Sequence, residues 1–553
     1  MTQPVAQIEG PQRTDSGQAV GVLRRLPRSV HVITALWALV LLSWSLLLPT
    51  FRSADEVGHV SASFYLAEER SWPGYHELPY LTWVYAALLP GNEDYEPLSQ
   101  AQAADLDVSF ADLHAAADTE YVGVDTIGQH PPGFYLLTAA VLSVAPDDLD
   151  TRQTVWLLRL VDVVLMTPLP LFLAIGAQRL RAGRATAICA ALLPFTIPQL
   201  GALGGAVNND NLLTITAAAV TVALVYVATG DTRWRTTVLL GLALAVALFS
   251  KAFALVLLPS VVLVHLVAAA RSRQWLGGAA RLAVVVALSA LGGWWWVANL
   301  VRYGAVQPAG HVPTLADGPL DPASALGAFV SSAAERIPMR FWATLSIQRN
   351  TLPAPFPAAL TTGLSILLVL LILLPLVIRP GQRVQRRTLA VLVLPFFAAG
   401  VVLLDNTWAL YLKTGAPAGL QGRYLFVGIT GVLIVVALFL THLLGRWAPL
   451  LMGLGGLTFT FASMRKVLGF HWAYRDSSLL DGLAALKTWS PLPLPALVVV
   501  VLALATTTVL AAMCTAWDLR HGDPADADLP PGPEAAGAPA QVPPGATAQR
   551  NLA

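Results

Sequence analysis

The 553-residue chain has few charged residues, since Asp, Glu, Lys and Arg together make up only 12 % of it. Soluble domains carry roughly 25 % charged residues, so this composition excludes an ordinary soluble enzyme. It also excludes an intrinsically disordered protein, which combines low hydrophobicity with high net charge. Hydrophobic residues account for 56 % of the chain, and this share predicts a polytopic membrane protein.

The chain also lacks cysteine clusters and an excess of either charge sign. Its two cysteines, Cys189 and Cys514, both lie in apolar runs, which favours buried small side chains over a disulfide framework or a zinc site. The formal net charge is +1. Because no basic excess is available to neutralise phosphates, we expect no nucleic-acid partner.

What the chain has instead is a series of continuous apolar runs. A β-barrel would need alternating segments of about ten residues, whereas these runs are near the twenty residues of a membrane-spanning helix. We therefore predict an all-α polytopic fold with about twelve transmembrane helices. The predicted spans are 30–50, 152–178, 185–203, 211–229, 236–250, 252–270, 281–301, 357–378, 388–404, 424–444, 447–463 and 491–514. The apolar segment 133–144 is shorter, and we expect a re-entrant or interfacial helix there.

Arginine is concentrated in every second connection between these spans, which predicts the orientation by the positive-inside rule. Both termini are then cytoplasmic, in the plasma (inner) membrane. The predicted organisation is a cytoplasmic segment 1–29, a transmembrane domain 30–514 and a disordered cytoplasmic tail 515–553. The large outer loops are 51–151, 302–356 and 464–490, and the first is expected to contain interfacial helices. A protein with this layout acts on the outer face.

Two motifs in the first outer loop could carry chemistry. Asp55, Glu56 and His59 follow the first span directly, and a carboxylate beside lipid can have a raised pKa and act as a general base. The alternative is a solvated polar collar at a helix end. These three side chains could also hold a divalent metal, which the pattern alone leaves open. His130 precedes Pro131-Pro132, where a helix N-terminus could hold an anion or simply follow a loop.

Charges within the apolar runs are costly, so each is a candidate functional residue. Arg159 and Asp162 lie three positions apart and could pair with each other, or the arginine could contact a phosphate. Lys251 is expected at the outer tip of a tight hairpin, where it could bind a lipid phosphate or extend to the interface.

Two further polar positions lie at the outer ends of spans. Asp210, in Asn208-Asn209-Asp210-Asn211, could cap the next helix or orient a sugar hydroxyl. Arg423, in Gln421-Gly422-Arg423-Tyr424, could hold a phosphate with both arms of its guanidinium group.

The order of these motifs resembles the GT-C glycosyltransferases, a superfamily that includes protein O-mannosyltransferases and the aminoarabinose transferases of lipid A. The segments Ala54–His59 and Gln421–Tyr424 look most like an uncharacterised bacterial family of polytopic membrane proteins in the GT-C clan. The resemblance implies a GT-C-like fold and transfer of a sugar, with inversion, from a polyprenyl-phosphate donor. The implied acceptor is a cell-envelope glycan, lipid or protein on the outer face, and membrane lipid surrounds the protein.

The resemblance also implies roles for particular residues. Asp55 corresponds to the catalytic carboxylate, with Glu56 beside it. The implied substrate-binding residues are His59, His130, Arg159, Asp210, Lys251, Arg423 and Tyr424. The chain departs from related transferases at Gln129, where they often carry an acid, and Asp125 is the nearest acidic residue. The alternative function is a transporter or flippase of a lipid-linked sugar or envelope precursor, which would have internal repeats and charges near the membrane midplane.

Overall fold

The computed structural model describes residues 21–87, 107–180, 182–308, 314–315, 318–346, 356–378, 385–473 and 478–521. The predicted cytoplasmic tail 515–553 and the segment 1–29 therefore lie largely outside the described residues. Within them, ten helices are long and apolar enough to cross a membrane, judged by length and composition. The prediction of an all-α polytopic protein is confirmed.

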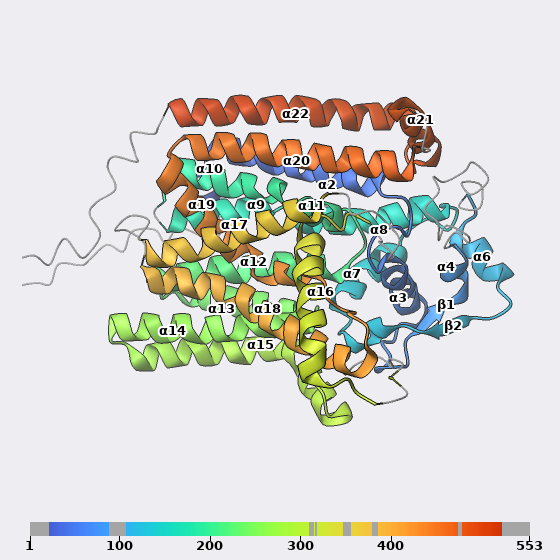
Figure 1. The fold of residues 1–553 in the computed structure, drawn as a ribbon, viewed down its shortest axis with the longest axis horizontal. Helices are drawn as coiled ribbons and strands as arrows, with labels where there is room; N and C mark the ends of the chain where they lie inside the picture. Colours follow the sequence, from blue (N-terminus) through green and yellow to red (C-terminus); the bar gives the residue numbers. More distant parts are fainter. Residues whose placement is uncertain are drawn as a thin grey trace, which may run out of the picture.

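The long helices lie side by side in one bundle (Figure 1). Their bounds are α2 (Arg28–Leu47), α8 (Thr151–Met166) continued by α9 (Leu169–Arg179), α12 (Asn209–Ala228), α14 (Leu258–Ser272), α15 (Trp275–Tyr303), α17 (Ala358–Val377), α18 (Arg386–Thr414), α19 (Ile429–Leu444), α20 (Trp447–His471) and α22 (Leu494–Arg520). The short 3-10 helices η4 (Ala252–Leu257) and η5 (Gly422–Gly428) precede α14 and α19.

Two of the twelve predicted spans depart from a single long helix. The span predicted at 185–203 consists of α10 (Arg184–Leu192), the 3-10 helix η3 (Leu193–Thr196) and α11 (Pro198–Gly204). The chain bends by 75° between η3 and α11. The bend occurs there because Pro198 has no backbone N–H with which to continue the preceding helix. The span predicted at 236–250 is α13 (Trp234–Leu248), whose 15 residues reach only roughly 22 Å. The count by length is therefore ten, or eleven if the bent pair is one span.

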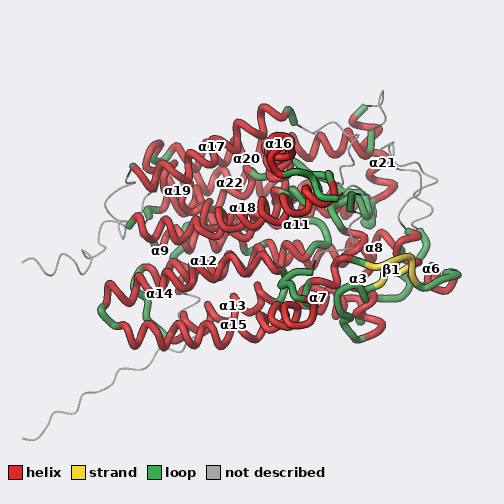
Figure 2. Tube along the Cα trace, turned by 60° about the horizontal axis from the view of Figure 1, so that its bottom comes forward, coloured by secondary structure: helices red, strands yellow, loops and turns green. Residues whose placement is uncertain are grey.

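The elements of the first large loop gather at one end of the bundle, which we call the loop end (Figure 1). They are α3 (Glu56–Glu69), α4 (Thr82–Ala86), α6 (Phe110–Ala116), α7 (Gly133–Leu142) and the antiparallel strands β1 (Pro79–Leu81) and β2 (Tyr121–Val124). The predicted short helix at 133–144 is α7. The strands were not predicted, because β2 has only four residues, all of them exposed. Figure 2 shows the strand pair at the loop end of an otherwise helical molecule.

Two more helices belong to the loop end. The helix α16 (Pro322–Trp342) crosses the bundle at a steep angle to the long helices, and α21 (Leu479–Trp489) lies beside the end of α20 (Figure 1). At the opposite end, the backbone N–H of Ser29 donates to Asp518 Oδ2 at 2.9 Å, so the start of α2 and the end of α22 meet there.

Close packing at the loop end depends on Gly422, the first residue of η5. A Cβ atom there would lie 2.4 Å from both Ile337 O and Phe341 N of α16. The segment that carries Arg423 can therefore approach the crossing helix only because residue 422 has no side chain.

We predict that Gly422→Ala separates η5 from α16 and lowers the free energy of unfolding by about 1–3 kcal/mol, because the backbone of α16 cannot yield easily. Gly327→Ala on the same helix is the matched control, since no atom lies within 4 Å of its Cβ position. Thermal unfolding in detergent measures both. Equal melting temperatures for the two variants would contradict the role of the close approach.

Candidate active site

Asp55 lies at the N-terminus of α3 with its carboxylate directed outward. Its backbone is left-handed, with φ 60°, and its side chain is 62 % exposed. Phe51, four residues earlier, also has a positive φ of 62°. Positive φ is uncommon for residues other than glycine, and surrounding contacts must hold it.

The contacts that hold this segment come from a buried ion pair between Glu56 and Arg159. Arg159 Nε and Nη2 donate to the two carboxylate oxygens at 2.7 and 2.6 Å, and the side chains are 0 % and 3 % exposed. Both oxygens of Glu56 are also used by the backbone, because the N–H groups of Phe51 and Val207 donate to them at 3.0 and 3.2 Å. The adjacent carboxylates thus face opposite ways, Asp55 outward and Glu56 into the protein.

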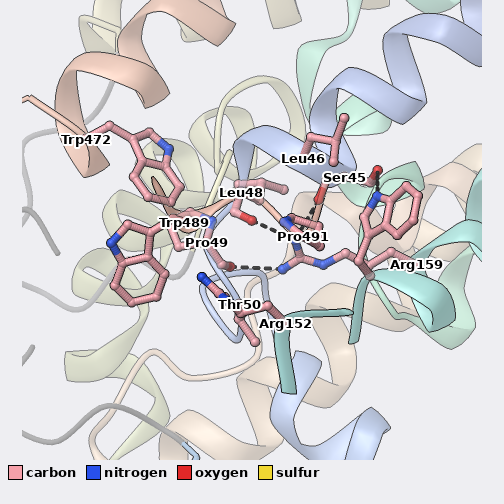
Figure 3. Close-up of a pocket in the computed structure, with 11 residues that line it drawn as sticks. Ser45, Leu46, Leu48, Pro49, Thr50, Arg152, Arg159, Trp472, Trp489 and Pro491 are labelled. Carbon is pink, nitrogen blue, oxygen red and sulfur yellow. Dashed lines mark hydrogen bonds between the residues drawn. The ribbon is translucent and has the colours of Figure 1, made fainter. Parts of the chain in front are cut away.

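Arg159 also fixes the end of α2. Its guanidinium donates to the carbonyl oxygens of Ser45, Leu48 and Pro49 at 2.6–2.9 Å (Figure 3). The alternative that Arg159 pairs with Asp162 is therefore wrong. The arginine bonds Glu56 instead, while Asp162 Oδ1 accepts a hydrogen bond from Asn211 Nδ2 at 2.9 Å.

Arg423 links the carboxylates of Asp55 and Asp210. Its Nη2 donates to Asp55 Oδ2, and its Nε lies 3.3 Å from Asp210 Oδ2. Lys251 Nζ donates to Asp210 Oδ1 at 2.6 Å and lies 4.6 Å from the centre of the Tyr424 ring. Five residues predicted from the sequence, carried by four separate segments, thus converge on one site.

Asp210 takes part in this site because it does not cap its own helix. The side chain of Asn208 caps α12, accepting from the backbone N–H of Asp210 at 2.9 Å. The capping alternative for Asp210 is therefore wrong. Its carboxylate is 4 % exposed and serves Lys251 and Arg423.

Arg340 of α16, whose charge interacts with those of Arg423 and Asp55, was not predicted from the sequence. Burial and the charges of Arg336 and Arg423 lower the pKa of Arg340, and Tyr424 and Asp55 raise it by less. The guanidinium group of Arg340 therefore lies near Arg423, Tyr424 and Asp55. Its hydrogen bond among the described residues goes to the carbonyl oxygen of Leu420, at 3.2 Å. Arginines four positions apart share a helix face, and that spacing was the available signal.

The charges around Asp55 set its protonation. Desolvation raises the pKa of Asp55, because protein surrounds the carboxylate closely although its side chain is exposed, but Arg423, His59 and Lys251 lower the pKa by more. The net shift is downward, opposite to the rise that a carboxylate beside lipid can show. Asp55 is therefore ionised at neutral pH.

His59 and His130 are both buried next to this site. His59 Nδ1 lies 2.8 Å from the hydroxyl of Tyr135, and burial lowers the pKa of His59 to about 4 although Asp55 opposes this. Burial, Lys251 and His59 lower the pKa of His130 well below its ordinary value. Both imidazoles are neutral near pH 7.

Gln129, the residue at which the sequence departs from the transferases that it resembles, is hydrogen-bonded to α15 and Gln307. Its carbonyl oxygen accepts from Trp295 Nε1 at 3.1 Å, and its side-chain oxygen accepts from Gln307 Nε2 at 3.1 Å. Asp125 is the acid of this loop whose charge interacts with Asp55.

Among the described residues, no group of three or more His, Cys, Asp or Glu side chains is arranged to hold a metal ion. Asp55, Glu56 and His59 do not form one ligand set, since Glu56 is bound by Arg159.

Ten helices of the described residues, each long and apolar enough to cross a membrane, define a multi-pass membrane protein. The chain belongs to the DUF2142 family of predicted membrane proteins, whose model matches residues 38–432. The match contains Asp55, Asp210, Lys251, Arg340 and Arg423, whereas α20–α22 lie beyond it.

Comparison with solved structures gives loose similarities. ArnT from Cupriavidus metallidurans bound to undecaprenyl phosphate is 15 % identical, with 78 % of this chain and 79 % of that chain covered and a TM-score of 0.30. The Archaeoglobus fulgidus oligosaccharyltransferase is 11 % identical, with 88 % and 56 % covered and a TM-score of 0.38. The archaeal oligosaccharyltransferase AglB from Archaeoglobus fulgidus, in complex with an inhibitory peptide and a dolichol-phosphate, is 10 % identical. The match covers 88 % of this chain and 56 % of that chain, with a TM-score of 0.39.

The chain thus spans about half the length of the archaeal enzyme. These TM-scores are too low to transfer residue roles. No curated protein sequence matches the chain.

We predict that the protein loses stability in acid because of His59. The pKa of His59 is about 4 in the folded protein and 6.5 in its ordinary state. At pH values between these two, the unfolded chain binds a proton at His59 that the folded protein does not bind. The contribution of His59 to the free energy of unfolding is therefore complete above pH 6.5 and decreases by about 3 kcal/mol as the pH approaches 4. Thermal unfolding from pH 4.5 to 7.5 measures this. His59→Gln should flatten the profile, and the exposed control His114→Gln should not; a wild-type profile in both would contradict the assignment.

We predict that Glu56→Gln lowers the free energy of unfolding by about 3–5 kcal/mol, since it leaves the buried charge of Arg159 without a counter-charge. The control Glu68→Gln removes a carboxylate that is 37 % exposed and 4.0 Å from His114, and it should change stability by about 0–1 kcal/mol. Denaturation in detergent measures both. A loss for Glu56→Gln no larger than the control's would show that the pair does not hold the segment.

Proposed function

We propose that the protein is a GT-C-type integral membrane glycosyltransferase, which transfers a sugar from a polyprenyl-phosphate donor to an acceptor hydroxyl at the loop end. The observation that supports this most directly is the pairing of an exposed, ionised carboxylate, Asp55, with a buried cation, Arg423. A base beside an anion-binding group is what the breaking of a sugar–phosphate bond requires.

In the proposed reaction, Asp55 accepts the proton of the acceptor hydroxyl. The contacts of Asp55 with the described side chains use Oδ2, so Oδ1 is available for that proton. The acceptor oxygen forms a bond to the anomeric carbon as the bond from that carbon to the phosphate oxygen breaks. The electron pair of the broken bond leaves with the lipid phosphate, and the configuration inverts.

The leaving phosphate gains negative charge, which cations at the site stabilise. Lys251 and Arg423 share the carboxylate of Asp210, whereas Arg340 contacts a neutral carbonyl oxygen. We therefore propose that Arg340 supplies the least neutralised charge to the phosphate, with Arg423 and Lys251 beside it. Tyr424 supports Lys251 through its ring.

Glu56 has a different role in this proposal from the catalytic one that the resemblance implies. Its oxygens are occupied by Arg159 and by two backbone N–H groups. Glu56 and Arg159 are therefore positioning residues, which hold Asp55 facing outward. His59 and His130 remain substrate-binding candidates as neutral hydrogen-bonding groups.

We further propose that the loop end faces outward from the plasma membrane and both termini face the cytoplasm, because arginines predominate in the connections at the other end. The transporter alternative is less well supported, since the charges of Asp55, Asp210, Lys251 and Arg423 lie at the ends of helices rather than within them. The specificity of the proposed enzyme consists in its choice of sugar and of acceptor.

We predict that Asp55→Asn reduces transfer about 10²–10⁴-fold, because the amide cannot accept the acceptor proton. The assay incubates purified protein with radiolabelled polyprenyl-phosphate sugars and an envelope extract, and it measures labelled product and free polyprenyl phosphate. Asp118→Asn, an exposed carboxylate of the same loop, is the control and should keep wild-type activity.

Full activity of a folded Asp55→Asn variant would exclude Asp55 as the base. Movement of intact donor across a vesicle membrane, with no cleavage by the wild type, would favour the transporter alternative.

A further inference from the structure

The two sides of Asp55 differ in charge. Toward the bundle, Asp55 faces the cations Arg423 and Lys251. On the side of the strands lie Tyr80 of β1 and Asp125, the residue after β2. The charge of Asp55 raises the pKa of both groups. The proposed function uses only the cationic side and leaves this second pair of polar groups without a role.

The strands bring Tyr80 and Asp125 together. Pro79 pairs with Val124 across the antiparallel ladder, and the backbone N–H of Asp125 donates to Leu78 O at 2.7 Å. The backbone N–H of Ile127 donates to Asp125 Oδ1 at 2.9 Å and so fixes the direction of the carboxyl group. Asp125 is 1 % exposed.

Gly58 allows these groups to approach the start of α3, the helix that follows Asp55. A Cβ atom at this position would lie 3.0 Å from Asp125 Oδ2 and 3.3 Å from the Tyr80 hydroxyl. Both oxygens therefore lie over the first turn of α3, three residues beyond Asp55. The glycine of the Asp-Glu-Val-Gly-His motif leaves the space that they occupy.

The electrostatics of this side disfavour an anion. Burial, with the nearby charge of Asp55, raises the pKa of Asp125 to about 7, and burial, Asp125 and Asp55 raise the pKa of Tyr80. Asp55 is therefore the ionised group next to Tyr80 and Asp125, and its charge is negative, whereas Arg423 and Lys251 act on the other side. A phosphate is favoured on the cationic side, and an uncharged hydroxyl compound on this one.

We propose that Tyr80 and Asp125 form the acceptor subsite and bind the hydroxyl groups of an uncharged glycan next to the one that Asp55 deprotonates. This rests on the proposed function. A phenol and a carboxyl group offer both donors and acceptors to vicinal hydroxyls, whereas a Ser or Thr peptide presents only one hydroxyl. The donor and acceptor then approach Asp55 from opposite sides.

The test measures two reactions of the same labelled polyprenyl-phosphate sugar, its hydrolysis by water and its transfer to a neutral oligosaccharide. Tyr80→Phe and Asp125→Asn should raise the acceptor KM about tenfold, the effect of losing one hydrogen bond. Hydrolysis and the Kd for polyprenyl phosphate should stay within twofold of wild type. The control Tyr121→Phe removes a hydroxyl from an exposed position of β2 and should leave all three values unchanged.

A second comparison uses the same oligosaccharide carrying a carboxylate. The wild type should use it about tenfold less well than the neutral form, and Asp125→Asn should narrow that difference. Tyr80→Phe removes a single oxygen atom, so it keeps the test decisive if Asp125→Asn folds poorly.

Three results would overturn the subsite. One is an equal loss of hydrolysis, polyprenyl-phosphate binding and transfer in Tyr80→Phe. Another is an unchanged acceptor KM in both variants, and the third is saturation by a Ser or Thr peptide but by no glycan. Absence of any donor cleavage by the wild type would instead overturn the proposed function, and the two failures are therefore distinguishable.

Discussion

The buried ion pair between Glu56 and Arg159 is the interaction on which the loop end depends. It joins the end of α2, the start of α3, the middle of α8 and the backbone before α12. A charge pair removed from water is stable only when its remaining donors and acceptors are satisfied, and here backbone groups satisfy them. As a result, Asp55 keeps a left-handed backbone and an outward carboxylate. Two neighbouring acids in the sequence thus have opposite environments.

Around Asp55, charge is arranged in an alternating chain, with Arg423 between two carboxylates and Lys251 on the far side of Asp210. Each buried charge is compensated by its neighbour, so the site can exist within an apolar bundle. An incoming phosphate would substitute for a carboxylate as a partner of the cations. The crossing helix α16 adds Arg340, and it approaches closely because residue 422 has no side chain.

Much of the site could be predicted from the sequence, because ionised groups are costly within apolar runs and therefore stand out. Lys251 was identified in this way, whereas Asp55 was identified from its motif directly after the first span, and Asp210 and Arg423 from their positions at span ends; the four residues meet. Arg340 on α16 and Tyr80 on β1 lie outside the apolar runs, so the cost of a buried charge does not single them out. The partner of Arg159 could not be predicted, because spacing along one helix identifies local neighbours such as Asp162, whereas Glu56 lies 103 positions away.

The sequence by itself determined the helical membrane class and the expected positions of nearly all the spans, because apolar length and helix length are tied by the thickness of a bilayer. It also determined which polar residues lie at helix ends. Only the tertiary structure decided which charges pair, which of two adjacent carboxylates is exposed and which loop residues surround it. These pairings and exposures depend on contacts between segments that are distant in the chain. Backbone hydrogen bonds and close approaches at glycine fix those contacts, and neither produces a periodic pattern in the sequence.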